Sequence, residues 1–147
     1  MRPIQSMKIR RAKKSDVPRL AELSGELGYP TSEKEMKQRF SEINPPARHA
    51  VFVAEQERQV IGWIHVSITP LLEVARRAEV NGLIVADGHR SSGAGAQLLE
   101  AAEAWARSKS CTGMSVRSNV IRDRAHAFYE RRGYLHYKTQ KAFRKPL

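Results

Sequence analysis

Two glycines, two serines and an arginine stand together in the stretch HRSSGAGA, residues 89–96, directly before the helix-like segment QLLEAAEAWARSK. Gly93 and Gly95 would let the backbone approach a ligand closely, and the first N–H groups of a helix have no partners inside it. Together with the positive end of the helix dipole, such groups form an anion site. A surface turn capped by a serine explains the same residues, so the loop alone leaves both interpretations open.

Two known phosphate motifs do not fit this loop. A Walker-type loop needs Lys and then Ser or Thr after its last glycine, but Ala96 follows Gly95. A dinucleotide-binding fingerprint needs a third glycine three residues after Gly95, where Leu98 stands, and an acidic residue on a following strand. What remains is Arg-x-x-Gly-x-Gly between a strand and a helix.

The elements that position this loop follow from periodicity, caps and breakers. Helical spacing of apolar residues after a cap at Ser15 or Asp16 predicts a first helix that ends at Gly28. Thr31 or Ser32 can cap a second helix, and Glu35 can complete a capping box there. Further helices are expected over 97–109 and 123–133, and strands over 7–12, 49–56, 59–70, 78–86 and 112–118, with a final hairpin over 134–147.

The element order β-α-α-β-β-β-α-β-α-β-β predicts one mixed α/β domain over residues 1–147, with residues 1–6 as a loose N-terminal extension. The strands 49–56 and 59–70 should form an antiparallel hairpin, and the segment 79–118 a right-handed parallel crossover. Gly82 inside a strand indicates a β-bulge.

Two segments carry a resemblance to a known family. AEVNGLIVADGHRSSGAG, residues 78–95, resembles the acetyl-CoA-binding signature of the GCN5-related N-acetyltransferases (GNAT family). SNVIRDRAHAFYERRGY, residues 118–134, is similar to the family's later segment, in which a strand-end Asn precedes a helix carrying Ala, Phe-Tyr and Gly-Tyr. Because both motifs occur in family order within a matching element order, the likeness covers Met7 to Leu147.

The resemblance implies acetyl-CoA as co-substrate, with no metal. The CoA pyrophosphate would be held by main-chain N–H groups of the loop, that is by Arg90, Ser91, Ser92, Gly93, Ala94, Gly95 and Ala96. The backbone of Leu83, Ile84 and Val85 would pair with the pantetheine arm as an added strand, and the Leu83 N–H would polarise the thioester carbonyl. Asn119 would bond the pantetheine amides, although a turn or cap role explains it equally well.

Direct transfer to an amine needs a base for the amine and an acid for the leaving thiolate. Tyr129 lies where the family usually places the acid and would also contact the cofactor, with a core aromatic beside Phe128 as the alternative. Glu79 lies where some members recruit a general base, and a salt bridge to Arg76 or Arg77 is the alternative.

The family's acceptor site is bordered by the first two helices, here around Leu27, Gly28 and Tyr29, with Glu79 nearby. Residues 15–44 carry six acidic against four basic residues, whereas residues 117–147 carry nine basic against two acidic ones. This split suits a cationic amine and the phosphates of CoA. We expect a small amine, aminoglycoside-like or polyamine-like, and protein N-termini or lysines are the alternative acceptors.

The net charge of +11 keeps a nucleic-acid-binding module and a catalytically silent CoA sensor as rival hypotheses. No aromatic-studded strand or recognition helix supports the former, so no nucleic-acid partner is expected. No membrane partner is expected, because no apolar stretch is long enough to span a bilayer. No metal is expected either, because the histidines do not have the spacing of metal ligands; they are His65, His89, His126 and His136. The single Cys111 fits a cytoplasmic protein, and homodimers are common in the family.

Overall fold

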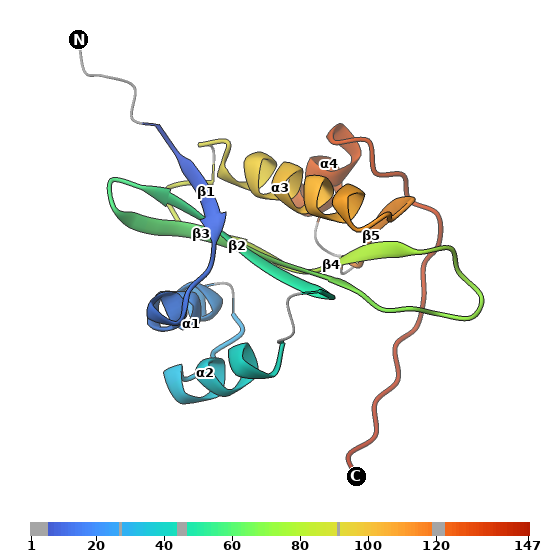
Figure 1. Cartoon of the computed structure of the whole chain (residues 1–147), viewed down its shortest axis with the longest axis horizontal. Coiled ribbons are helices and arrows are strands. Elements are labelled where there is room, and N and C mark those ends of the chain that lie inside the picture. Colours follow the sequence, from blue (N-terminus) through green and yellow to red (C-terminus); the bar gives the residue numbers. More distant parts are fainter. Residues whose placement is uncertain (1–5, 27, 44–46, 91, 119–122) are drawn as a thin grey trace. The chain divides into compact units, whose positions relative to one another are not determined.

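The structure, a computed structural model, describes residues 6–26, 28–43, 47–90, 92–118 and 123–147. It divides into two compact units, Met1–Val116 and Arg117–Leu147. The first unit holds a five-stranded sheet in the order β1-β2-β3-β4-β5 (Figure 1). Its strands are β1 (Lys8–Arg11), β2 (His49–Gln56), β3 (Gln59–Ile68), β4 (Arg77–Val85) and β5 (Gly113–Val116). Its helices are a 3₁₀ turn η1 (Lys14–Asp16), α1 (Val17–Glu26), α2 (Glu33–Glu42) and α3 (Ala94–Ser108), and the second unit holds α4 (Asp123–Arg131).

The two sides of the sheet are covered by different helices. Helices α1 and α2 lie on one side and α3 lies on the other (Figure 1), and we call these sides the α1 face and the α3 face. The core on the α1 face consists of Leu20, Leu23, Val53, Val60, Ile84 and Ala86, with Ala12, Met36, Phe40 and Trp63 packed against it. On the α3 face, the helix buries Leu98, Leu99, Ala102 and Trp105. The sheet is therefore the middle layer of the first unit.

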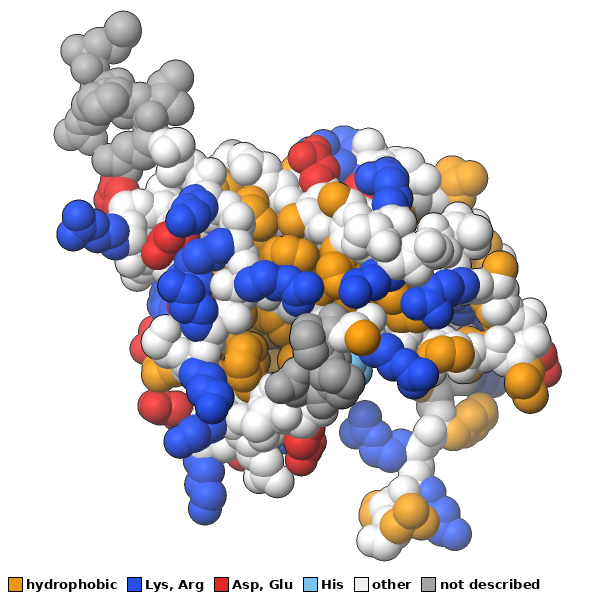
Figure 2. Space-filling view, viewed as in Figure 1, with side chains coloured by type: hydrophobic (Ala, Val, Ile, Leu, Met, Phe, Trp, Pro, Cys, Tyr) orange, Lys and Arg blue, Asp and Glu red, His pale blue; other side chains and the backbone are white. Residues whose placement is uncertain are grey.

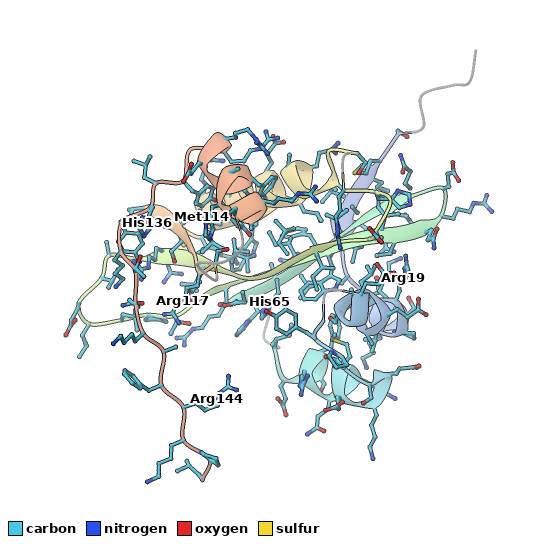
Figure 3. The ribbon with its side chains drawn as sticks, turned by 180° about the vertical axis from the view of Figure 1, so that it is seen from behind. Arg19, His65, Met114, Arg117, His136 and Arg144 are labelled. Atoms are coloured by element: carbon cyan, nitrogen blue, oxygen red, sulfur yellow. The ribbon has the colours of Figure 1, made fainter. Side chains whose placement is uncertain are left out.

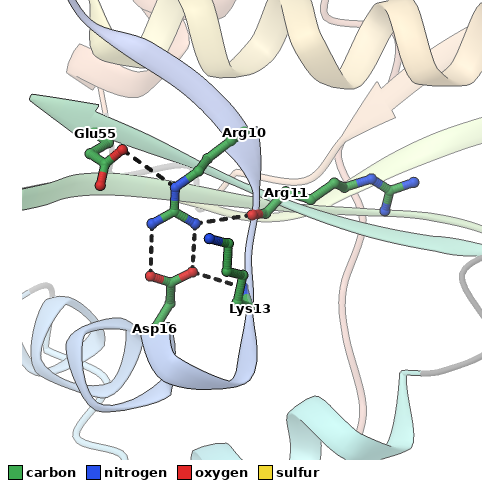
Figure 4. A network of polar contacts seen from close by, with 5 residues as sticks. All are labelled: Arg10, Arg11, Lys13, Asp16 and Glu55. Carbon is green, nitrogen blue, oxygen red and sulfur yellow. Dashed lines mark hydrogen bonds and ion pairs between the residues drawn. The ribbon is translucent and has the colours of Figure 1, made fainter. Parts of the chain in front are cut away.

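The caps predicted for the first two helices are met in different ways. Ser32 caps α2 as expected: the Glu35 N–H donates to Ser32 Oγ at 3.1 Å, and the Ser32 N–H donates to Glu35 Oε1 at 3.0 Å. Asp16 ends the 3₁₀ turn, and its carboxylate accepts from Arg10 Nη1 and Nη2 at 2.8 and 3.0 Å and from the Lys13 N–H at 2.7 Å (Figure 4). The hydrogen bonds from Arg10 lower the pKa of Asp16 and tie β1 to the start of α1.

Strand pairing follows the expected directions. Strands β2 and β3 form an antiparallel hairpin, and β4 and β5 are parallel. His65 pairs with Gly82 whereas Val66 pairs with Val80, so Asn81 has no partner on β3. The bulge predicted from Gly82 is therefore confirmed at Asn81. A Cβ atom on Gly82 would lie 3.0 Å from two atoms of the Trp63 ring, which explains the glycine.

The predicted final hairpin is wrong. Residues 134–147 form neither a strand nor a helix. Leu135, Phe143 and Leu147 are 84%, 91% and 117% exposed, so the apolar residues of this segment are not buried. Alternation of apolar and polar residues selects a face, but a strand also needs a partner and a surface to cover, and an isolated hairpin is marginal in water.

The surface charge, the one thiol and the lengths of the helices bear on possible partners. Lys and Arg side chains are spread widely over the face seen in Figure 2, in keeping with the net charge of +11. Cys111 is a free thiol and is half-buried. Among the helices of the described residues, none is long and apolar enough to cross a lipid bilayer.

Candidate active site

The start of α3 has the geometry of an anion site. Gly93 caps the helix with φ +87°, a left-handed conformation that favours glycine, and a Cβ atom there would meet nothing within 4 Å. The Ala94 N–H lies 3.3 Å from Ser92 Oγ. The N–H groups of the first turn have no acceptor within their own helix and point out of its N-terminus, so this end can bind an anion.

The loop before α3 adds a cation at this end. The Arg90 side chain is 40% exposed, and its Nη1 lies 3.8 Å from Asp87 Oδ1, a long and weak surface pair. The Asp87 N–H donates to Glu26 Oε2 at 3.2 Å and thereby ties the loop to the end of α1. Arg90 can therefore turn toward a phosphate at little cost, whereas Ser91 lies outside the described residues.

An open edge of β4 leads toward this loop. β5 pairs with β4 only from Arg77↔Gly113 to Val80↔Val116, whereas β3 remains paired to β4 as far as Val85. Within the described part of the chain, residues 81–85 of β4 therefore have a strand on one side only. Their other main-chain groups can pair with an extended ligand. This is the segment in which the sequence pointed to Leu83, Ile84 and Val85; Asn119 lies outside the described residues.

A row of polar side chains crosses four strands on the α1 face. Strand register places His49, Ser67, Glu79 and Ser115 beside one another on β2, β3, β4 and β5. Ser67 and Ser115 are 6% and 8% exposed. The hydroxyl of Ser115 is buried and has no hydrogen-bond partner among the described residues. Because a buried hydroxyl without a partner is costly, this polar row is suited to a polar ligand.

Two further groups border the polar row. Asn81 Nδ2, at the bulge, donates to Ser67 Oγ at 2.7 Å. His65, one pair along from Ser67, lies 3.0 Å from His49, measured from Nε2 to Nδ1, and the rings stack with centroids 5.3 Å apart. Figure 3 shows His65 pointing from the sheet to the side of α1 and α2. Burial, and then the charge of His49, lowers the pKa of His65 to about 4, so its ring is neutral at neutral pH.

Sequence reasoning missed most of this surface. It found Glu79, but set His65 aside for lacking metal-ligand spacing and did not single out His49, Ser67 or Ser115. A signal was present in β3, whose sequence QVIGWIHVSI carries two polar residues at alternate positions of an apolar run. What the sequence does not contain is the register that sets four strands side by side.

The connection between α1 and α2 lies on the same side of the sheet as the polar row (Figure 1). Gly28 has φ +88°, and its N–H donates to the Gly25 carbonyl at 3.1 Å while the Tyr29 N–H donates to Ser24 O at 3.1 Å. These bonds end the helix, as Gly28 predicted, and leave the Tyr29 side chain 59% exposed. Leu27 lies outside the described residues.

The second unit holds Tyr129 on α4. Its ring is half-buried and meets the rings of Phe128 and Tyr134 edge-on, with centroids 5.2 and 5.8 Å away. Gly133 has φ +90°, and the Tyr134 N–H donates to the Tyr129 carbonyl at 3.0 Å, so the helix ends at the glycine as predicted. The role of Tyr129 as the acid stays a prediction.

The described residues contain no group of three or more His, Cys, Asp or Glu side chains that could hold a metal ion. The groups described above for this site are main-chain N–H groups, one exposed guanidinium, one carboxylate and a set of neutral polar side chains.

The chain is similar to known proteins in sequence and in fold. The sequence profile of the acetyltransferase (GNAT) family matches residues 17–134. An aminoglycoside N(6′)-acetyltransferase type 1 of Klebsiella aerogenes is 29% identical over 105 residues, which are 69% of this chain and 68% of the relative. Among solved structures, aminoglycoside N-acetyltransferase AAC(6′)-Iy in complex with CoA superimposes with a TM-score of 0.89 at 19% identity, covering 100% of this chain and 99% of that one. Glucosamine-6-phosphate N-acetyltransferase from Arabidopsis thaliana gives a TM-score of 0.80 at 21% identity, covering 95% and 98%.

Proposed function

Because the chain belongs to the GNAT acetyltransferase family, and is thus an acetyl-CoA-dependent N-acetyltransferase, we propose that it acetylates a small cationic amine, aminoglycoside-like or polyamine-like. The observation that carries the proposal is the polar row on the α1 face, in which the Glu79 carboxylate stands between the small neutral groups Ser67 and Ser115. A carboxylate among hydroxyls suits an ammonium group on a hydroxylated or polyamine framework. The relative from Klebsiella aerogenes, named for its action on aminoglycosides, supports the same class.

The start of α3 and the open edge of β4 fit acetyl-CoA as the co-substrate. The first-turn N–H groups of α3, from Ala94 to Ala96, would bind the pyrophosphate together with Arg90. The backbone of Leu83 to Val85 would pair with the pantetheine arm along the open edge of β4. The anion site lies at the start of α3, on the α3 face, whereas the polar row lies on the α1 face. The two substrates would thus approach β4 from opposite sides and meet at its edge.

Transfer would proceed by direct attack in a ternary complex. The amine nitrogen forms a bond to the thioester carbon, and the carbon–sulfur bond breaks with its electron pair going to sulfur. The Leu83 N–H would stabilise the oxyanion, Glu79 would draw in the ammonium group or, through water, take its proton, and Tyr129 would protonate the thiolate. A phenol with an ordinary pKa of about 10 is suitably matched to a thiol of about 8.5.

A thiol-release assay with a panel of amines tests the proposal. At fixed acetyl-CoA, we expect turnover of kanamycin A or spermidine, and a loss of kcat/KM of about 10²-fold in Glu79→Gln, the size typical of a general base. Glu100→Gln, an exposed carboxylate on the outer surface of α3, is the matched control and should keep wild-type rates. Equal rates for Glu79→Gln and wild type would show that this carboxylate does not serve the acceptor. Preferred turnover of peptide N-termini would move the acceptor to the protein class.

A further inference from the structure

The two imidazoles on the α1 face are not used by the function proposed above, on which this inference rests. His65 on β3 and His49 on β2 are joined by one hydrogen bond, between Nε2 of His65 and Nδ1 of His49 at 3.0 Å. We propose that this pair is a proton relay, in which His65 takes the proton that the acceptor amine loses and His49 releases a proton to solvent.

The position of His65 suits this role. His65 is paired with Gly82, the residue directly before Leu83, whose N–H would hold the thioester carbonyl. Gly82 has no side chain of its own, and the Trp63 ring lies where its Cβ atom would be. His65 points to the α1 face, the side from which the acceptor would approach (Figure 3). Leu83 pairs with Ile64, so His65 and Trp63 are the two β3 side chains that flank its level on the α1 face. Of these two, only the imidazole can accept a proton.

The hydrogen bond between the rings makes the pair directional. Each neutral imidazole carries one N–H and one lone pair, and one proton lies between His49 Nδ1 and His65 Nε2. The two outer nitrogens, His65 Nδ1 and His49 Nε2, then always have opposite roles: one carries a proton and the other a lone pair. Moving the central proton from one ring to the other exchanges these roles, so a proton that enters at His65 leaves at His49.

The surroundings keep the entering nitrogen unprotonated. Burial holds the pKa of His65 far below neutral pH, so the ring cannot keep a proton and must pass it on. The titratable groups of the described sheet that share this part of the α1 face are His49 from β2 and Glu79 from β4. From α1, the Arg19 guanidinium is bonded to the Val60 carbonyl and to Glu22. Glu79 can hold the ammonium group while its proton leaves through the histidines.

Each turnover moves one proton from the amine to solvent through the two rings. The ammonium N–H bond breaks and its proton bonds to His65 Nδ1, the proton on His65 Nε2 moves to His49 Nδ1, and the proton on His49 Nε2 goes to water. Both rings end neutral, with their tautomers exchanged, and one proton has reached solvent. The freed lone pair of the amine forms the bond to the thioester carbon.

The test compares His65→Gln, His49→Gln and the double variant, with His136→Gln as the matched control because His136 is exposed and bonds only Thr139 at 2.9 Å among the described contacts. Thiol release is measured over pH with the best amine of a panel of kanamycin A, spermidine, glucosamine and a peptide N-terminus, and in mixtures of H₂O and D₂O. A relay predicts that kcat falls about 10²-fold in each single variant, with no further loss in the double variant. It also predicts a proton inventory that is curved for wild type and linear for the variants.

Each outcome decides the proposal. Thermal stabilisation by acetyl-CoA, which should be unchanged in all variants, shows that they are folded; if His65→Gln fails to fold, His49→Gln carries the test alone. Full kcat in a folded single variant, or losses that add up in the double variant, would overturn the relay and leave the proposed function standing. If no amine of the panel is acetylated by wild type, the proposed function fails and the relay falls with it.

Discussion

Replacing Gly62 by alanine tests how closely β3, β4 and α3 are packed beside the proposed cofactor edge. Gly62 lies on β3. A Cβ atom there would lie 2.9 Å from the Ile84 carbonyl oxygen and 3.2 Å from Leu98 Cδ1. Ordinary contacts are 3.4–4 Å long, so the first distance is about 0.5 Å too short, and the atom that must yield belongs to the backbone of β4.

The expected cost follows from this geometry. Adding a carbon to a close-packed interior costs about 1–3 kcal/mol, and the reduced freedom of the unfolded chain returns about 0.4–1 kcal/mol. Gly62→Ala should therefore lower the free energy of unfolding by about 1–2 kcal/mol, which corresponds to a Tm lower by roughly 3–8 °C for a chain of this size. Because the displaced atom belongs to Ile84, whose backbone would pair with pantetheine, the affinity for acetyl-CoA should also fall, by about fivefold per kcal/mol lost.

Urea and thermal unfolding measure the first effect, and titration calorimetry with acetyl-CoA the second. Gly25→Ala is the matched control, since Gly25 is exposed within α1 and a Cβ atom there would meet nothing within 4 Å. This control should stabilise the protein by about 0.5–1 kcal/mol, as expected for Gly to Ala in a helix. If Gly62→Ala is as stable as wild type and binds acetyl-CoA equally well, the close packing of β3 against β4 inferred here is refuted.

Three further changes test the electrostatics and the helix cap. Asp16→Asn should lower the free energy of unfolding by about 3 kcal/mol at neutral pH, because it leaves the half-buried Arg10 without its main partner. The folded pKa of Asp16 is lowered, so its stabilising contribution is complete above the unfolded pKa of about 3.9 and is lost as the pH falls through the folded pKa. Urea unfolding of the variant should therefore depend less on pH than that of wild type below about pH 3.9. The folded pKa of His65 is lowered from 6.5 to about 4, so the unfolded chain binds the proton first and wild type loses stability as the pH falls from about 6.5 to 4. This loss of stability should be absent in urea unfolding of His65→Gln. If the variant retains it, another group titrates in this range. Gly93→Ala should lower the free energy of unfolding, measured by thermal unfolding, by about 1–2 kcal/mol, and Gly93→Asn should lower it clearly less. The reason is the φ of +87° at this position, a conformation that asparagine tolerates better than alanine. Equal losses of stability in the two variants would contradict a purely conformational cost.

The helices and strands of the first unit could be predicted because their signals are local. Ser32 and Glu35 specify a cap within four residues, and the glycine at position 82 marks the bulge within its own strand. The candidate anion site at Gly93 is equally local, because one loop and one helix start would provide it. Such features depend on short-range hydrogen bonds and sterics, which the order of residues fixes directly.

The remaining features depend on long-range pairing. The polar row exists because four strands set His49, Ser67, Glu79 and Ser115 side by side, and the sequence of one segment does not show which residues of the other strands lie beside it. The error at residues 134–147 has the same origin, because alternation alone was taken as a strand where no surface takes up the apolar residues. The low pKa of His65 likewise depends first on burial by the folded chain and then on His49, which is sixteen positions away along the chain.

We propose that this N-acetyltransferase uses the polar row to select a small cationic amine. Initial rates of thiol release at saturating acetyl-CoA, compared between kanamycin A, spermidine and a peptide N-terminal amine, measure this selection. We expect a kcat/KM for one of the two polycations at least about tenfold above that for the peptide, which corresponds to ~1.4 kcal/mol of discrimination. A preference for the peptide, or the absence of turnover with all three amines, would contradict it.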